Sequence, residues 1–187
     1  MTTDREAIVA CQKGLKESYR FLVEKYKVRA YHAALAWTGN SEEAMDISQE
    51  AFYRAYRSLK KVDPEKNFYT WLYKIIKNLS INYLKKSEMV NRINRSADGS
   101  IIDTNFSNDA DKPDWIYEEN EKKQLLWRAI NMLELRDKEI VILKEFQEMG
   151  YREIAETLEI PIGSVMSRLY YARKKLIKNL GLLSDEE

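Results

Sequence analysis

Residues 151–178, YREIAETLEIPIGSVMSRLYYARKKLIK, contain two helical patterns with almost no chain between them. Apolar residues recur at intervals of three or four in each half, which predicts a short helix followed by a longer one. Pro161 separates the halves. Because proline cannot continue a helix but is tolerated at the start of the next, the break covers only residues 159–161. The stretch therefore predicts a helix-turn-helix.

The longer of these helices is basic. Its residues from Ile162 to Lys178 include no acid, and its cations are Arg168, Arg173, Lys174, Lys175 and Lys178. A helix that lies against DNA phosphates needs such a charge. The small polar residues Ser164 and Ser167 lie near its N-terminal end, the part that reaches base edges in this motif. A basic helix is also often only a solvated surface, so the pattern leaves DNA recognition and simple solubility open.

Helical periodicity also dominates the rest of the chain, without a convincing alternating strand pattern or an internal repeat. One face of a first helix is predicted by Ile8, Cys11, Leu15, Leu22 and Tyr26. The helical pattern then continues to the stop signal Gly39-Asn40. Further helices are predicted over residues 41–59, 70–86, 115–132 and 136–147. The sequence therefore predicts an all-α fold.

Periodicity fails between residues 87 and 113, where Ser, Asn, Asp and Gly are frequent. Acids outnumber bases over residues 87–121, whereas residues 66–86 contain lysines and no acid. We interpret residues 87–113 as a flexible acidic linker, because so long a structureless stretch is uncommon inside one compact domain. The sequence then predicts two small helical domains, residues 1–86 and 114–187, the second containing the helix-turn-helix.

Composition argues against several classes of protein. Cys11 is the only cysteine and His32 the only histidine, so we expect no metal site. The sequence also has no Gly-rich phosphate-binding loop, so we expect no cofactor. The absence of a nucleophile–histidine pair argues against an enzyme. We expect a cytoplasmic protein without membrane insertion, because no apolar run is long enough to cross a bilayer and no signal-peptide pattern opens the chain. A formal net charge of +1 argues against nonspecific coating of nucleic acid.

Two features of the first half allow either a functional or an ordinary interpretation. A polar band of Asp46, Gln49, Glu50 and Arg54 follows one predicted helix, and solubility alone would explain it. Aromatic residues cluster over residues 67–71 within the acid-free segment. Rings interleaved with lysines suit single-stranded nucleic acid, because the rings stack on unpaired bases. The competing interpretation places Phe68 and Trp71 in the core, and we expect at least one of them there.

Taken together, the two halves resemble a bacterial RNA polymerase sigma factor of the extracytoplasmic-function (ECF) type. Sigma region 2 is similar to GNSEEAMDISQEAFYRAYRSL followed by FYTWLYKIIKNLSINYLKK, and region 4 to ELRDKEIVILKEFQEMGYREIAETLEIPIGSVMSRLYYARKKL. The resemblance covers roughly residues 7–180. It implies a protein that binds core RNA polymerase, directs it to promoters and helps melt the −10 element, while polymerase performs the catalysis.

The resemblance also implies roles for residues. The surface that docks on the clamp of the largest polymerase subunit is matched by Asp46, Gln49, Glu50, Phe52 and Arg54. The part that meets the melting −10 element is matched by Phe68, Tyr69, Trp71, Lys74, Asn78, Lys85 and Lys86. The helix that enters the −35 major groove is matched by Ser164, Met166, Ser167, Arg168, Tyr170, Tyr171, Arg173 and Lys174. Residues 62–66 match a loop that captures a flipped base. The linker matches a segment threaded toward the RNA path, and an anti-sigma factor is an implied partner.

Two positions of the predicted recognition helix depart from the family pattern. Met166 and Tyr171 stand where the family commonly has lysine or arginine. Neither residue can make the bidentate hydrogen bonds that read guanine, so the −35 sequence is not predicted. Two alternatives use the same residues differently. A helix-turn-helix regulator acting without core polymerase would leave residues 46–50 and 68–71 without a role. A helical interaction module with a basic face would need no promoter at all.

Overall fold

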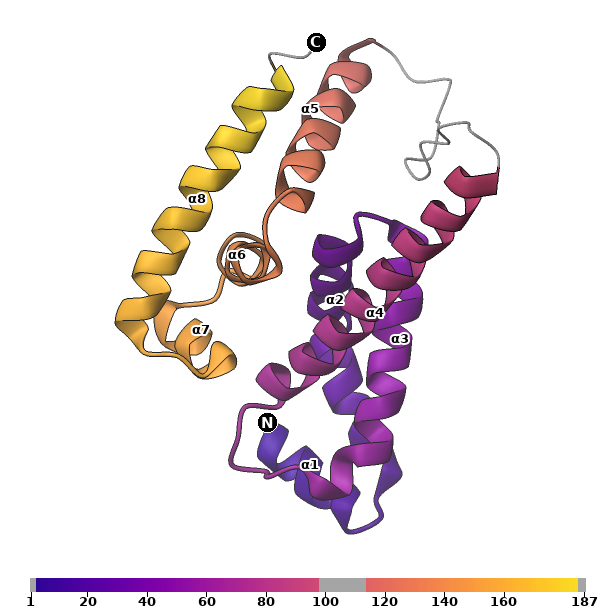
Figure 1. Cartoon of the computed structure of the whole chain (residues 1–187). Coiled ribbons are helices and arrows are strands. Elements are labelled where there is room, and N and C mark those ends of the chain that lie inside the picture. Colours follow the sequence, from indigo (N-terminus) through magenta and orange to yellow (C-terminus); the bar gives the residue numbers. More distant parts are fainter. Residues whose placement is uncertain (1–2, 98–113, 185–187) are drawn as a thin grey trace. The chain divides into compact units, whose positions relative to one another are not determined.

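The computed structural model describes residues 3–97 and 114–184, and every regular element in these ranges is a helix (Figure 1). The chain divides into two compact units, residues 1–104 and 105–187. The predicted all-α architecture in two parts is therefore confirmed. Most of the predicted linker, residues 98–113, lies outside the described residues.

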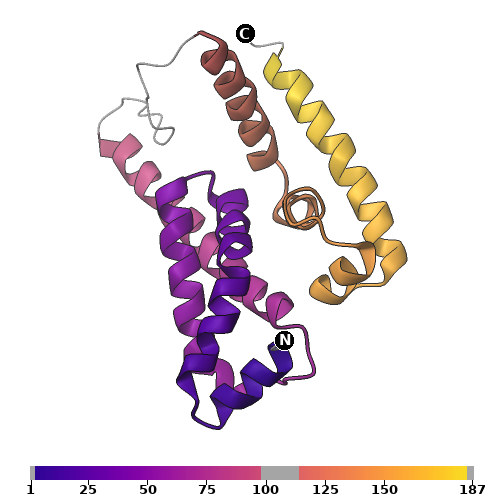
Figure 2. The same cartoon turned by 180° about the vertical axis from the view of Figure 1, so that it is seen from behind.

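The first unit is built on three long helices: α2 (Tyr19–Thr38), α3 (Ser41–Ser58) and α4 (Phe68–Ala97). These three pack against one another, and a short helix α1 (Asp4–Gln12) lies at one end of them (Figures 1 and 2). The buried residues at the centre come from all three helices, among them Trp37, Ala51 and Tyr73. Inside this core Trp37 Nε1 donates a hydrogen bond to Tyr73 Oη at 3.3 Å.

The single first helix predicted through Leu15 is wrong, because the chain turns sharply after α1. Gly14 adopts a left-handed backbone with φ 101°. The amide of Gly14 donates to the Cys11 carbonyl and that of Leu15 donates to the Ala10 carbonyl, both at 3.0 Å. This pair of bonds is a Schellman motif, which ends a helix and favours glycine at the left-handed position. Ile8 is buried as predicted, whereas Leu15 is exposed and Cys11 is partly exposed.

The stop and start signals between α2 and α3 are confirmed. Gly39 takes the left-handed conformation, with φ 69°, just after α2 ends at Thr38. The side chain of Asn40 then caps α3 by accepting a hydrogen bond from the Glu43 amide at 3.1 Å. The predicted apolar row along α3, which includes Ala44, Ile47 and Ala55, is buried.

Helix α4 is longer than predicted. We expected it to end near Lys86, but it continues to Ala97, so the first residues of the predicted linker are helical. The sequence contains no proline or glycine between Pro64 and Gly99. Extending an existing helix requires only one more fixed residue per hydrogen bond, so a polar stretch without a breaker continues it.

The second unit contains α5 (Asp114–Asn131), α6 (Leu135–Val141), α7 (Tyr151–Leu158) and α8 (Ile162–Ser184). A π-helical turn, η3 (Ile142–Phe146), follows α6. Helix α8 packs against the other three helices (Figure 1). The predicted helix-turn-helix is confirmed as α7 and α8, and Glu159 turns the chain between them with φ 56°. The π turn was not predicted.

Replacing Glu148 by glycine is expected to raise the free energy of unfolding of this unit by about 0.5–1 kcal/mol. Glu148 is exposed and has φ 52°, a left-handed conformation that is costly for a residue with a Cβ atom. Chemical unfolding followed by amide exchange in α7 and α8 would measure the gain. The matched control, Glu156→Gly inside α7, should lose about 1 kcal/mol. Equal losses for both variants would contradict the prediction.

Candidate nucleic-acid and polymerase interface

The predicted polar band occupies the outer face of α3. Asp46, Gln49 and Arg54 are exposed and Glu50 is half-buried. Arg54 Nε and Glu50 Oε1 form an ion pair at 2.6 Å, one helical turn apart. Both charged groups stay in contact with water, so this pair contributes little to stability. The face is therefore available for a partner without loss of core packing.

Phe52 does not belong to this face, although it was grouped with it by resemblance. Its ring is 8% exposed, and its carbonyl accepts a hydrogen bond from Tyr19 Oη at 2.7 Å. Two residues that the sequence analysis missed lie there instead. Tyr53 is 56% exposed, and the Arg57 guanidinium lies 5.7 Å from the centre of its ring. Their spacing of three and seven positions from Glu50 could have indicated them.

At the start of α4 the aromatic cluster separates into buried and exposed members. Phe68 and Tyr69 are fully buried, whereas Trp71 is half-buried. The rings of Phe68 and Trp71 lie 5.8 Å apart, and the guanidinium of Arg29 sits 3.9 Å above the Tyr69 ring. Burial raises the pKa of the Tyr69 hydroxyl far above its ordinary value. The expectation that at least one of Phe68 and Trp71 lies in the core is therefore confirmed by Phe68. Tyr69, which was not expected in the core, is buried as well, and neither side chain can reach DNA in this conformation.

The remaining residues expected at the −10 element lie mostly on one side of α4. Trp71, Lys74, Asn78 and Lys85 are separated by three, four and seven positions, a spacing that places them on one helical face. Trp71 and Lys74 are half-buried, while Asn78 and Lys85 are exposed. Lys86 is exposed too, but lies to one side of this row. We call the row of four the α4 face.

Helix α8 has one buried and one exposed side. Val165, Leu169 and Ala172 are buried against the unit. The residues expected at the −35 element are distributed over the opposite side and its margins. Met166, Tyr170 and Tyr171 expose 52%, 55% and 62% of their surfaces, and Ser167, Arg173 and Lys174 are exposed too. Only Ser164 and Arg168 are partly covered.

Four side chains on the exposed side of α8 contact a neighbour. The Arg173 guanidinium donates to Glu145 Oε1 from Nη2 at 2.6 Å and from Nε at 3.1 Å. Lys174 Nζ lies 4.8 Å from the centre of the Tyr170 ring. The rings of Tyr170 and Tyr171 meet edge to face at 5.3 Å between centres. These contacts arrange an aromatic and basic surface before any ligand is present.

Two neighbouring charged residues, Asp137 and Lys138, are buried in the second unit, and their burial was not predicted from the sequence. Asp137 is 8% exposed and pairs with Lys175 Nζ of α8 at 2.5 Å. Lys138 is 3% exposed and donates to Asn131 Oδ1 at 2.8 Å. Burial lowers the pKa of Lys138 to about 8. The pattern RDKE looks like a solvated surface, so no sequence signal identified these residues as buried.

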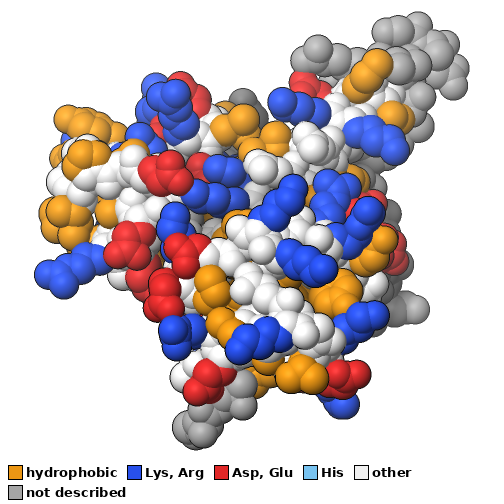
Figure 3. Space-filling model, turned by 90° about the horizontal axis from the view of Figure 1, so that it is seen from below, with side chains coloured by type: hydrophobic (Ala, Val, Ile, Leu, Met, Phe, Trp, Pro, Cys, Tyr) orange, Lys and Arg blue, Asp and Glu red, His pale blue; other side chains and the backbone are white. Residues whose placement is uncertain are grey.

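On the face that Figure 3 shows, Lys and Arg side chains lie among hydrophobic and acidic ones. Among the residues whose side chains the structure describes, 3–90 and 122–183, no three His, Cys, Asp or Glu side chains converge as a metal ion would require. No helix in the described part of the chain combines the length and apolar character needed to span a membrane.

Comparison with known proteins identifies the family. Residues 22–89 match the family model for sigma-70 region 2, and residues 123–176 match the model for sigma-70 region 4. The ECF RNA polymerase sigma factor SigW of Bacillus subtilis is 31% identical over 94% of this chain and 96% of its own length. The chain belongs to the ECF RNA polymerase sigma factors. The RNA polymerase sigma-H factor of Pseudomonas aeruginosa is 30% identical over 98% of this chain and 96% of its own.

Two solved structures share the fold of this ECF sigma factor. CnrH, in complex with the cytosolic domain of CnrY, has a TM-score of 0.67 and 20% identity, covering 98% of this chain and 99% of that one. RpoE of Bartonella quintana, in complex with the anti-sigma factor NepR, has a TM-score of 0.60 and 20% identity, covering 88% and 98%. This sigma factor directs RNA polymerase to promoters. A regulator acting without polymerase is not favoured, because both regions match in order.

Proposed function

We propose that the two domains predicted from the sequence, residues 1–86 and 114–187, divide promoter recognition between them. The first binds core RNA polymerase through the outer face of α3 and meets the melting −10 element with the α4 face. The second places the exposed side of α8 in the major groove at −35. The protein needs no catalytic group of its own, since polymerase makes the RNA, and it acts in the cytoplasm where polymerase works.

The α4 face is the observation that carries this proposal. It places the Trp71 ring on the same side of α4 as Lys74 and Lys85. The opposite side of the helix is fixed by buried residues such as Leu72 and Ile76. A half-buried ring beside lysines gives an unpaired base a surface to stack on and gives its phosphate a cation. A helix that only solubilised the protein would have no need of a partly exposed tryptophan there.

Trp71→Ala is expected to reduce opening of the −10 duplex while leaving core binding unchanged. Losing a stacked base costs about 1–3 kcal/mol, so open complex should fall roughly 5-fold to 100-fold. The amount of open complex would be measured by permanganate reactivity of unpaired thymines near −10, on promoters that the wild-type holoenzyme opens. Trp71→Phe keeps a ring and should retain most of the activity. Wild-type reactivity in Trp71→Ala would remove this residue from the −10 interface.

Asp46→Ala combined with Gln49→Ala should weaken association with core RNA polymerase by about tenfold or more, because interface energy concentrates in a few residues. Fluorescence titration of the labelled protein with core polymerase would measure the dissociation constant. Glu24→Ala with Lys27→Ala, a pair exposed on α2, is the matched control. Circular dichroism should show unchanged helix content in both variants. Equal affinity for core would exclude this face of α3 as the docking surface.

At −35, Met166 and Tyr171 contact bases through apolar surface and a hydroxyl group. Both are well exposed, and neither can make the bidentate hydrogen bonds with which arginine reads guanine. A thymine methyl group is a suitable partner for Met166. The nearby Lys174 and Arg173 then contact phosphates, a sequence-independent part of the binding energy.

An anti-sigma factor is a further proposed partner. CnrH and RpoE were each solved with a protein bound, CnrY and NepR respectively. A partner of this kind would cover the polymerase-binding face of α3 or the DNA-binding side of α8. Affinity capture of the tagged protein from its own cells, followed by competition with core polymerase, tests this. A captured protein that does not compete with polymerase would contradict the proposal.

A further inference from the structure

Helix α1 contacts the loop that joins α3 to α4. This loop, residues 62–67, follows the short helix η2 (Leu59–Lys61). Gln12 is the last residue of α1, and its amide nitrogen donates to the Leu59 carbonyl at 3.0 Å and to the Val62 carbonyl at 2.8 Å. The Leu59 carbonyl also accepts a hydrogen bond from the Val62 amide at 3.1 Å. The Gln12 side chain therefore adds a link from the end of α1 to the end of η2 and to the first residue of the loop.

A second contact is made in the middle of the loop. The Glu65 amide donates to Asp63 Oδ1 at 3.0 Å, and the Lys66 amide donates to the Asp63 carbonyl at 3.1 Å. Asp63 thereby closes a tight turn. The carboxylate of Glu65 forms an ion pair with Arg5 of α1. The loop thus has one fixed turn of its own and two points of attachment to α1.

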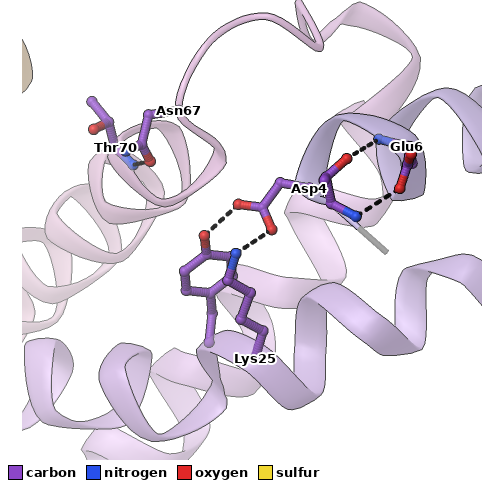
Figure 4. A network of polar contacts seen from close by, with 7 residues as sticks. Asp4, Glu6, Lys25, Asn67 and Thr70 are labelled. Carbon is purple, nitrogen blue, oxygen red and sulfur yellow. Dashed lines mark hydrogen bonds and ion pairs between the residues drawn. The ribbon is translucent and has the colours of Figure 1, made fainter. Parts of the chain in front are cut away.

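Helix α1 is itself attached to α2 through Asp4. Figure 4 shows Asp4 facing α2, where its carboxylate accepts hydrogen bonds from Lys25 Nζ at 2.6 Å and from the Tyr26 hydroxyl. The Tyr26 ring lies 5.7 Å from that of Phe68 and 5.4 Å from that of Tyr69. The same buried rings support the start of α4. Helix α1 and the α4 face therefore rest on one aromatic cluster.

We propose that Gln12 and Arg5 are positioning residues, which hold the 62–67 loop in the conformation that receives an unpaired promoter base. This inference rests on the proposed role of the first domain at −10. Helix α1 lies outside the segment that matches region 2, residues 22–89. Arg5 and Gln12, which make these contacts, are therefore not part of the segment that matches region 2. A loop that is ordered before DNA arrives loses less conformational entropy on binding, which favours capture of the base.

The first experiment measures amide hydrogen exchange of residues 62–67 in the free, full-length protein. Gln12→Leu keeps the size of the side chain but cannot donate, and exchange in the loop should become about tenfold faster or more. Gln12→Lys keeps a donor and should restore much of the protection. Lys13→Leu, at the next and exposed position, is the matched control and should behave as wild type. Unchanged loop exchange in Gln12→Leu would overturn the proposal.

The second experiment tests the consequence for promoters. Holoenzyme made from each variant and core polymerase is given a library of promoter fragments whose −10 bases are randomised, and fragments that become permanganate-reactive are sequenced. Gln12→Leu should open about tenfold less of the library and discriminate less at one −10 position, with unchanged affinity for core. Gln12→Lys should recover both properties. A faster-exchanging loop with wild-type opening and base preference would show that α1 serves stability only, and would overturn the positioning role.

The ion pair has its own test. Arg5→Glu and Glu65→Arg should each reduce opening, and the double variant, which restores the pair with reversed charges, should recover it. Failure of the double variant to recover would remove Arg5 from the proposal. If the wild-type protein forms no holoenzyme at all, the proposed function fails, and the positioning role with it. Loop exchange, measured without polymerase, distinguishes that failure from an absence of contact between α1 and the loop.

Discussion

Phe68→Ala lowers the free energy of unfolding of the first unit by an expected 3–5 kcal/mol. The side chain is fully buried, with the rings of Tyr26 and Trp71 5.7 Å and 5.8 Å from its own. Truncating a buried phenylalanine removes its burial energy and leaves a cavity that the neighbours fill only partly. A loss of this size approaches the total stability of many domains, so promoter opening would fail together with the fold.

The measurement is residue-resolved amide exchange over a urea series, because a chain with two units need not unfold in one step. Trp71→Ala is the control, because truncating this half-buried side chain should lower the free energy of unfolding clearly less. This pair of variants separates the two interpretations of the aromatic cluster, core packing and contact with the −10 element. A stable Phe68→Ala protein that still failed to open promoters would indicate that Phe68 leaves the core to contact DNA.

Lys138→Met should raise the free energy of unfolding of the second unit by about 1–3 kcal/mol at pH 7. Lys138 is buried, and its pKa is lowered from 10.5 to about 8 because burial disfavours the ammonium form. Methionine keeps the unbranched chain and carries no charge. The hydrogen bond lost at Asn131 is replaced by water, since Asn131 is exposed.

The pH dependence gives the sign of this effect. Between about pH 8 and 10.5 the unfolded chain holds a proton on Lys138 that the folded chain releases, so wild-type stability rises with pH. The advantage of Lys138→Met is then largest below pH 8 and shrinks as pH rises to 10.5. Amide exchange of α6 and α8 across this range measures it, with the exposed Lys122→Met as control. An advantage independent of pH would show that packing, not charge, limits stability here.

The elements that could be predicted are those specified by neighbouring residues. The turn at Glu159, the stop at Gly39 and the buried rows of α3 and α8 each follow from local periodicity or a local breaker. Gly14 carried the same kind of signal as Gly39. It was overlooked because Leu15 continued the apolar spacing, although Leu15 is exposed in the fold.

The interface was predictable only in part, because adjacent aromatic residues have different surroundings. Phe68, Tyr69 and Trp71 share one sequence motif, yet only Trp71 keeps part of its ring exposed. What decides this is the position of Tyr26 and Arg29 on α2, some forty residues earlier in the chain. Lys138 is likewise buried, although both of its neighbours in the sequence are charged. Contacts between residues far apart in the chain cannot be predicted from the pattern of neighbouring residues.

The division of α8 into a packed side and an exposed side also has an evolutionary consequence. Val165, Leu169 and Ala172 hold the helix in place, so changes at Met166, Tyr170 or Tyr171 need not disturb the fold. Duplicated copies of the gene could therefore diverge in the promoters they recognise through substitutions that are nearly neutral for stability. A designer could use the same freedom to build sigma factors that share one polymerase without activating one another's genes.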